Sequence, residues 1–256
     1  MRTRPLLWFY LLAFAISWLG WAPAVAASRG VAFFEHPAFQ ILLLLPAVGP
    51  TIAAVVVTRA TEGKEGVRSL MARLTRWRVS PLWYAVALLL PALVHLGAGA
   101  VDRVIGQPSS ETRLVGPTLV SFVIISLLAN PWEEVGWRGF ALPRFQARSN
   151  ALVATLAVGF LWGLWHIPLF LWAGGPTASS PFLASLIGMV AASFIYTWLY
   201  NATGGSLLIV ALYHIAGNVT GAMLGPLTGS AVGGAIVGSL IAVLLVLAFG
   251  PQRLAR

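Results

Sequence analysis

The sequence predicts an all-α integral membrane protein, a bundle of about eight transmembrane helices with cytoplasmic N- and C-termini. Three observations lead to this fold class. Hydrophobic residues make up 59% of the 256 positions and charged residues only 9%, whereas soluble domains carry about 25% charged residues. The apolar residues form long runs without the alternation of strands. The basic residues gather between alternate runs, as in membrane proteins.

Eight apolar stretches each approach the length of about 20 residues that a bilayer-spanning helix needs. They are Leu6–Ala26, Ala38–Val57, Pro81–Val101, Val115–Trp132 with a continuation, Ala151–Trp172, Pro181–Tyr200, Ser206–Leu224 and Ala231–Phe249. Turn signals at 106–110 and 174–176 separate neighbouring stretches, and no internal repeat is visible. We therefore expect one polytopic membrane domain over residues 1–256.

The first stretch also resembles a signal peptide, because Arg2 and Arg4 precede an apolar run that ends in Ala-Val-Ala-Ala. The apolar core of a signal peptide is usually about 7–15 residues long, and this run is clearly longer. We therefore expect an uncleaved first helix.

Arginine and lysine predict how the bundle is oriented in the cell's inner (plasma) membrane. With the N-terminus inside, the inner segments hold Arg2, Arg4, Arg59, Lys64, Arg68, Arg73, Arg76, Arg78, Arg138, Arg144, Arg148, Arg253 and Arg256. The outer loops hold Arg29, Arg103 and Arg113, so the asymmetry is 13 against 3 and places both termini in the cytoplasm. The net charge of +9 then reflects topology, and we expect no nucleic acid partner.

Several other features limit the function or the topology. The chain has no cysteine, which excludes disulfides, thiol catalysis and cysteine metal sites. Its single aspartate, Asp102, excludes a mechanism that needs two aspartates. Val67–Trp77 carries apolar residues at helical spacing among arginines, which predicts a short amphipathic helix on the inner leaflet or a solvated basic loop.

Two acids lie inside an apolar stretch, where charged groups cost several kcal/mol and usually mark function. They are the neighbours Glu133 and Glu134. The five other acids are expected in loops: Glu35, Glu62, Glu65, Asp102 and Glu111. His166 and His214 also lie inside apolar stretches. So does His95, which has no polar companion and is interpreted as a packing histidine.

Helical spacing sorts these polar groups. Glu134 and Arg138 are four residues apart and predict an ion pair. Glu133 points about 100° away from Glu134 and stays free. The same spacing of four puts the members of two further pairs on shared helix faces. These pairs are Trp162 with His166, and His214 with Asn218.

Depth in the membrane predicts that some of these groups meet. Glu133 and His166 lie equally far from the turn at 149–150, to within about one turn because Pro143 should bend the first arm. His214 also rises from a cytoplasmic turn, so we expect one inward-facing cavity that holds Glu133, His166, His214 and Asn218. Taken singly, the acidic pair could be a buried ion pair without chemistry, and each histidine a core residue.

Such a cavity suits hydrolysis of an amide without a covalent intermediate. A carboxylate in apolar surroundings can act as general base on water, and a histidine with an asparagine amide can stabilise the oxyanion. The zinc motif H-E-x-x-H is absent, and Ser206, the nearest serine candidate, lacks a following glycine. A metal site of Glu133, His166 and His214 remains an alternative, since two His plus one Glu is a known zinc set.

The motifs resemble those of the CPBP family, the type II CAAX prenyl proteases and their bacterial relatives, including bacteriocin-processing enzymes. The chain has Glu-Glu-x-x-x-Arg at 133–138, an aromatic residue four positions before His166, and then His214-x-x-x-Asn218. The resemblance covers 118–222 closely, which we expect to be the CAAX-protease-like catalytic core. The runs at 136–143 and 164–168 are typical of bacterial members. Trp162 stands where the family most often has phenylalanine.

The resemblance implies a role for each site residue. The expected catalytic set is Glu133 as base, His166 holding the water, His214 and Asn218 at the oxyanion, and Glu134 and Arg138 orienting the site. It implies an intramembrane endopeptidase that cuts near the cytoplasmic face of the membrane. No cofactor is expected, but a zinc-dependent version stays open because family members were first called metalloproteases.

The expected partners are the lipid bilayer and a peptide or protein substrate, lipidated or unmodified. Two other function classes remain as alternatives. A transporter would line a pathway with polar residues, but here these residues cluster at one depth. A non-catalytic immunity factor or membrane scaffold would not need intact motifs.

Overall fold

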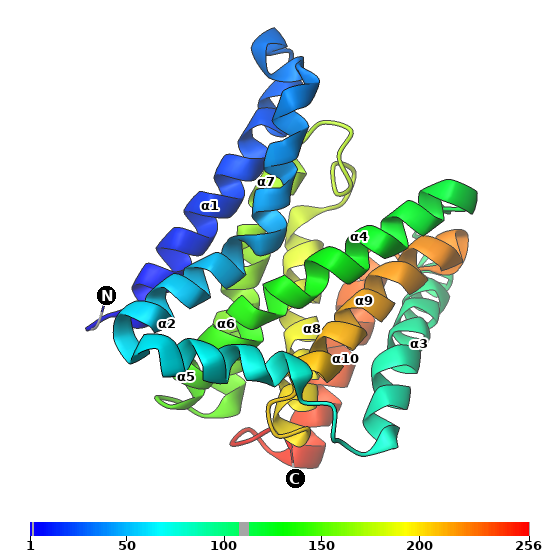
Figure 1. Ribbon diagram of the computed structural model, residues 1–256. Coiled ribbons are helices and arrows are strands. Elements are labelled where there is room, and N and C mark those ends of the chain that lie inside the picture. Colours follow the sequence, from blue (N-terminus) through cyan, green and yellow to red (C-terminus); the bar gives the residue numbers. More distant parts are fainter. Residues whose placement is uncertain (2, 108–112, 256) are drawn as a thin grey trace.

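The computed structural model describes residues 1, 3–107 and 113–255, and every regular element in this part of the chain is a helix (Figure 1). The α-helices are α1 (Pro5–Ala27), α2 (Leu44–Ala72), α3 (Pro81–Ile105), α4 (Gly116–Glu134), α5 (Leu142–Gln146), α6 (Ala151–Trp165), α7 (Ile167–Leu171), α8 (Phe182–Ala202), α9 (Leu207–Leu224) and α10 (Ala231–Phe249). The 3-10 helices are η1 (Ala32–Glu35), η2 (Pro37–Leu43), η3 (Arg73–Thr75) and η5 (Gly225–Leu227), and η4 (Val135–Ala141) is a π-helix.

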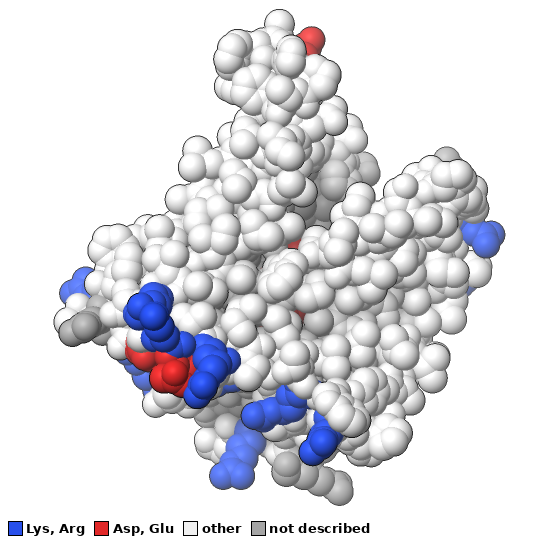
Figure 2. Space-filling view, viewed as in Figure 1, with Lys and Arg blue, Asp and Glu red and all other residues white. Residues whose placement is uncertain are grey.

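Eight helices of the described chain are long and apolar enough to cross a membrane, and they correspond to the eight predicted stretches. The fourth joins α4, η4 and α5 into one span, and the fifth joins α6 and α7. Large apolar side chains such as Val104 and Leu247 are exposed on the outer surface, which is mostly white in Figure 2. Such a surface needs lipid around it, so the prediction of an eight-helix membrane bundle is confirmed.

Helix α2 is longer than the sequence predicts. It continues past Val57 to Ala72 through a kink at Gly63, whose φ of +75° only glycine adopts easily. Glu62 and Glu65 therefore lie in a helix and not in a loop. The amphipathic helix expected at 67–77 is the end of this same helix, followed by η3. This end of α2 buries the apolar Leu70, which is only 4% exposed.

Asp102 is also helical, which corrects the prediction of a loop. Helix α3 extends past Val101 to Ile105, and Asp102 is only 2% exposed. Its carboxylate accepts hydrogen bonds from the backbone N–H and the hydroxyl of Ser230, the N-cap of α10. Asp102 thus joins the ends of α3 and α10. Glu35 lies in η1, and Glu111, Arg2 and Arg256 lie outside the described residues.

The helices splay apart at one end of the bundle (Figure 1). Helix α1 packs against α2 on one side, and α9 packs against α3 and α4 on the other. Helices α6, α8 and α10 pack in sequence between them. Figure 2 shows a hollow between the α1–α2 arm and α4, with acidic atoms visible inside it, while blue basic side chains gather at the opposite end.

Small residues bring the site-bearing helices close together. A Cβ on Gly136 of η4 would collide with the backbone of Pro50 in α2, and a Cβ on Gly159 of α6 would collide with Ser193 of α8. Without a hydrophobic force between helices in lipid, such backbone approaches supply much of the packing energy. They fix η4 and α6 against their neighbours, and the candidate site lies between these elements.

Candidate functional site

The acidic motif lies where α4 turns into the π-helix η4. Glu133 and Glu134 end α4, and Arg138 is in η4. Pro143 has no N–H, so the carbonyl of Gly139 cannot receive the usual helical bond from it. Arg73 fills this position, because its Nη1 donates to the Gly139 carbonyl at 3.0 Å. The sequence predicts a bend at Pro143, and the structure has the π-helix η4 directly before it. Segments of π-helix often occur at functional sites.

Glu134 and Arg138 form the predicted ion pair in the core of the bundle. Nη1 of Arg138 donates to both Glu134 carboxylate oxygens at 3.2 Å, and the two residues are 0% and 1% exposed. Nη2 of Arg138 donates to the hydroxyl of Ser193 at 3.1 Å. The guanidinium also lies 4.1 Å from the ring centre of Tyr196 and 4.6 Å from that of Trp162. Arg138 was counted with the inner loops, but it belongs to this buried network.

His214 on α9 joins the same network. Its Nδ1 lies 2.8 Å from Oε1 of Glu134. An ionised carboxylate only accepts hydrogen bonds, so Nδ1 of His214 is the donor. Its Nε2 is then the ring nitrogen left for other groups. Asn218, one helical turn later, is exposed and lines the same cavity as His214.

His166 follows directly after α6 and is held by that helix. Its Nδ1 lies 2.8 Å from the carbonyl of Trp162, so Nδ1 carries the proton and donates. The ring also packs edge-on against Trp162, with 5.2 Å between the ring centres. A neutral His166 therefore has a bare Nε2, which can accept a hydrogen bond.

Glu133 remains free, as the helical spacing predicts. Its Oε2 is buried and has no hydrogen-bond partner among the described residues. The indole N–H of Trp162 is also buried and interacts with this carboxylate without a hydrogen bond of standard geometry, and both residues line the same cavity. Buried polar atoms are rarely left unpaired, so a water molecule or a substrate group is the natural partner here.

One cavity of about 530 Å³ holds the four groups that the sequence predicts together. Glu133, His166, His214 and Asn218 all line it. Its other walls are mostly apolar and include Met189, Ala192 and Ile195 of α8 and Phe170 of α7. Glu134 and Arg138 do not line the cavity, because they lie behind its wall and hold His214 from there.

Loops form part of the wall of this cavity. Its loop-derived wall residues include Thr177, Ser180 and Gly229, and an adjoining hollow continues to Gln107 and Gly174. These loops lie at the splayed end of the bundle, opposite the arginine-rich end (Figures 1 and 2). In the topology that the charges predict, these lining loops are on the outer side of the membrane, and the inward-facing direction of the cavity stays a prediction. Counting residues from a turn predicts how deep a side chain lies in the membrane. It does not predict at which end of the bundle the helices separate.

Three residues of the site were missed or misread in the sequence. Ser193 and Tyr196 of α8 contact Arg138, and the only sequence signal is a pair of polar residues three apart in an apolar helix. His95 is more than a packing residue. Its Nε2 lies 3.0 Å from the Gly217 carbonyl, and the side chain lines the cavity. Every residue has a backbone carbonyl, so a side-chain contact with one cannot be predicted from residue types. Ser206, the nearest serine candidate, instead caps α9 and donates to the Arg76 carbonyl.

A zinc ion would suit the donor types but not their arrangement. Glu133, His166 and His214 form a known zinc set, and the hydrogen bonds at both Nδ1 atoms are typical of metal-binding histidines. Within residues 1, 3–107 and 113–255, however, no three His, Asp or Glu side chains are grouped closely enough to hold a metal ion. We therefore assign no chemical step to a metal. The expectation that the protein needs no cofactor stays a prediction, with zinc as the alternative.

The chain is similar to known proteins over this region and beyond. Residues 115–220 match the family model described as type II CAAX prenyl endopeptidase Rce1-like. The chain is also 23% identical over 233 residues to the CAAX prenyl protease 2 of Methanococcus maripaludis, with 82% of each chain covered. These matches confirm the resemblance that the three motifs predict, and the region matched by the family model contains all six predicted site residues, from Glu133 to Asn218.

Proposed function

We propose that this chain, a CAAX-protease-type membrane protein, is an intramembrane endopeptidase in which Glu133 activates a water molecule. One observation carries the proposal. The buried Oε2 of Glu133 has no partner among the described residues and faces a cavity shared with His166, His214 and Asn218. A free carboxylate beside two histidines and an amide provides the groups that water-mediated amide hydrolysis needs.

In the first step, Glu133 takes one proton of the water, and Nε2 of His166 accepts a hydrogen bond from its other proton. His166 can do so because its Nδ1–H is already bound to the Trp162 carbonyl, which leaves Nε2 bare. The hydroxide formed attacks the peptide carbonyl carbon, and the C=O electron pair moves onto the oxygen. When the tetrahedral intermediate collapses, the C–N bond breaks and Glu133 returns its proton to the leaving amine.

His214 and Asn218 stabilise the oxyanion of this intermediate. Because Nδ1–H of His214 is bound to Glu134, the ring must carry a second proton on Nε2 to donate there. Glu134 balances the resulting imidazolium, and Arg138 fixes the carboxylate from its other side. Glu134 and Arg138 are thus positioning residues, and the amide of Asn218 is the second oxyanion donor.

The substrate in this proposal is a peptide or protein segment that enters from the membrane. The apolar wall of α8 suits an apolar chain, whether it belongs to a side chain or to a lipid modification. Part of the cavity lining comes from loops at the end opposite the arginine-rich loops. In the charge-based topology of a multi-pass inner-membrane protein, with both termini in the cytoplasm, these lining loops are on the outer side. The scissile bond is at the depth of Glu133 in the bundle, and a cut near the cytoplasmic face stays a prediction.

The substitution Glu133→Gln tests the mechanism, since it removes the base with little change in volume. We expect purified Glu133→Gln protein to lose at least about 100-fold in peptide cleavage, the usual contribution of a general base. Glu65→Gln is the matched control, because Glu65 is 74% exposed and pairs with Arg68 far from the cavity. Cleavage by Glu133→Gln at the wild-type rate would show that another group activates the water.

Further measurements identify the substrate and show whether cleavage requires a metal. Comparative membrane proteomics of cells that express wild type or Glu133→Gln should reveal new peptide termini with wild type alone. Testing those peptides with and without a prenyl group shows whether a lipid is required. Metal analysis of active purified protein, together with its response to chelator, decides between the glutamate mechanism and the zinc-dependent alternative.

A further inference from the structure

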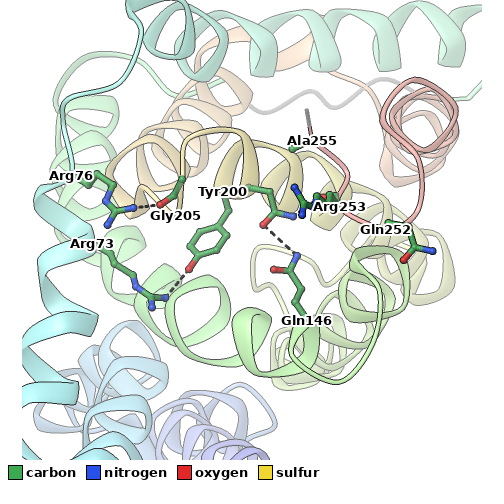
Figure 3. A pocket seen from close by; sticks show the side chains of 10 residues that line it. Arg73, Arg76, Gln146, Tyr200, Gly205, Gln252, Arg253 and Ala255 are labelled. Carbon is green, nitrogen blue, oxygen red and sulfur yellow. Dashed lines mark hydrogen bonds between the residues drawn. The ribbon is translucent and has the colours of Figure 1, made fainter.

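A second polar cavity lies at the arginine-rich end of the bundle, away from Glu133. Its volume is about 550 Å³, and its walls include Arg73, Arg76, Tyr200, Asn201 and Arg253. Figure 3 shows that the labelled arginines and Tyr200 come from separate parts of the chain, namely η3 and the residue after it, the end of α8 and the C-terminal segment. The proposed hydrolysis uses none of the residues in this wall.

Among the described residues, the wall of this cavity carries positive charge without an acidic side chain. Three arginines line it, and its described wall contains no carboxylate. The ion pairs found in the described chain involve Arg68, Arg138, Arg144 and His214, and none of the cavity arginines. An anion is therefore the missing partner.

Two of the three cavity arginines are held in place but keep most of their donors. Nη1 of Arg73 donates to the Gly139 carbonyl and, at 2.7 Å, to the Tyr200 hydroxyl, and Nη1 of Arg76 donates to the Gly204 carbonyl. A guanidinium has five N–H donors, so both arginines can still bind an anion without losing these contacts.

The rest of the wall is also fixed before any ligand binds. Nε2 of Gln146 lies 3.3 Å from Oδ1 of Asn201, and Nδ2 of Asn201 donates to the Arg253 carbonyl at 2.6 Å, which ties the C-terminal segment to α8. Gly205 has a φ of +86°, and a Cβ there would come within 3.3 Å of the Tyr200 hydroxyl. Its lack of a side chain allows the close approach that forms this wall (Figure 3).

We propose that this cavity binds a phosphate group. Guanidinium groups match phosphate oxygens in two-point contacts, and basic pockets between transmembrane helices commonly bind anionic lipid headgroups. The charge rule places this end of the bundle at the inner leaflet, so phosphatidylglycerol-type headgroups and free phosphate are the two sources of the ligand. A bound phosphate would also hold Arg73, which contacts the π-helix between Arg138 and Pro143. Occupancy of the cavity would thus stabilise the segment that carries the acidic motif.

The test is a binding titration of delipidated protein in neutral detergent. The probes are dioctanoyl phosphatidylglycerol, dioctanoyl phosphatidylcholine and inorganic phosphate, and the readout is the shift in thermal unfolding temperature. The cavity variant is Arg76→Gln with Arg253→Gln, which spares Arg73 because of its contact with η4. The matched control is Arg68→Gln with Arg148→Gln, which removes the same charge from exposed positions outside the cavity.

We expect the cavity variant to bind phosphatidylglycerol on the order of 25-fold more weakly, about five-fold for each arginine, and the control to change by less than about two-fold. Stronger binding of phosphatidylglycerol than of inorganic phosphate would identify a lipid headgroup as the ligand. Equal binding of the two would identify free phosphate. An equal loss in the cavity variant and the control, or equal binding of phosphatidylcholine to wild type, would overturn the proposal.

Discussion

Two neighbouring glutamates acquire different tasks from their surroundings. Glu134 accepts hydrogen bonds from Arg138 and His214 and is completely buried. Glu133, rotated by about 100° on the same helix, keeps a buried oxygen without a partner and faces the cavity. A carboxylate that is already saturated orients other groups, whereas a free one can take a proton.

This contrast predicts different effects for the two Glu→Gln substitutions. Glu134→Gln leaves the buried Arg138 without its counter-charge, so we expect a loss of about 3–5 kcal/mol in unfolding free energy together with loss of activity. Glu133→Gln should lose activity while its stability is unchanged or slightly higher. Thermal and denaturant unfolding in detergent, measured beside peptide cleavage, separates the two. Equal stability of both variants would contradict the assignment of Glu134 to a structural network.

Ser193 gives a second residue-scale prediction. Its hydroxyl accepts from Arg138, and hydrogen bonds to charged groups contribute about 1.5–3 kcal/mol. Ser193→Ala should therefore lower stability by roughly this amount. Cleavage should also fall, because Arg138 then holds Glu134 less firmly. Ser69→Ala in α2 is the control, since Ser69 is an exposed helical serine that does not line the cavity. A loss for Ser69→Ala as large as that for Ser193→Ala would rule out a specific role for the Arg138 contact.

The sequence predicts contacts within a helix better than contacts between helices. The Glu134–Arg138 pair follows from a spacing of four residues on one helix. The bond from His214 to Glu134 joins two helices, and it depends on how each helix is rotated about its axis. Spacing alone does not give that rotation, so the sequence placed His214 and Asn218 on one helix face but did not predict the contact of His214 with Glu134.

At the scale of elements, apolar length predicts each span, but local backbone chemistry decides where it is irregular. The eight stretches were recognisable because a bilayer-spanning helix requires about 20 apolar residues. The π-helix η4 was not predicted, and one of its carbonyls, that of Gly139, accepts from Arg73, 66 residues away in the chain, a contact that local spacing does not reveal. The continuation of α2 past Gly63 was missed because its residues are charged, although they remain helical.

Gly136 tests how closely η4 must approach α2. A Cβ at this position would meet backbone atoms of Pro50, which cannot move aside as a flexible side chain would. We expect Gly136→Ala to lower the unfolding free energy by about 1–3 kcal/mol and to displace the acidic motif, with reduced cleavage. Thermal unfolding and peptide cleavage, measured on the same preparations, check both effects.

Gly97→Ala is the matched control for this substitution. Gly97 also lies in a helix, but a Cβ there meets only side-chain atoms of Val237 at 3.6 Å or more, and Gly97 does not line the cavity. Alanine has the higher helix propensity, so this variant should be neutral or more stable by up to about 1 kcal/mol. If Gly136→Ala is as stable and active as Gly97→Ala, the close contact between η4 and α2 is not required for the site.

At the scale of the whole molecule, the basic residues and the loops that line the cavity lie at opposite ends of the bundle. Arginines gather at one end of the bundle, and the loops around the cavity mouth lie at the other (Figure 2). The lining of this cavity and its adjoining hollow comes from the splayed end and the middle of the bundle. None of it comes from the described loops at the arginine-rich end. A lining confined to one end and the middle of the bundle fits an enzyme site, whereas a transport pathway has to reach both sides.

Single cysteines can locate that mouth, because the natural chain contains none. Ala147 lies in an exposed turn at the arginine-rich end, and Ser179 is exposed beside the cavity mouth. If the positive-inside rule holds, a membrane-impermeant maleimide should label Ser179→Cys in intact cells and Ala147→Cys only in inverted vesicles.

Preincubation with a cleaved peptide should slow labelling of Ser179→Cys and leave Ala147→Cys unaffected. The reverse labelling pattern would put the mouth in the cytoplasm and would show that the arginine count fails for this chain. Either pattern fixes the side from which a substrate reaches Glu133, because the two loops lie at opposite ends of the same bundle.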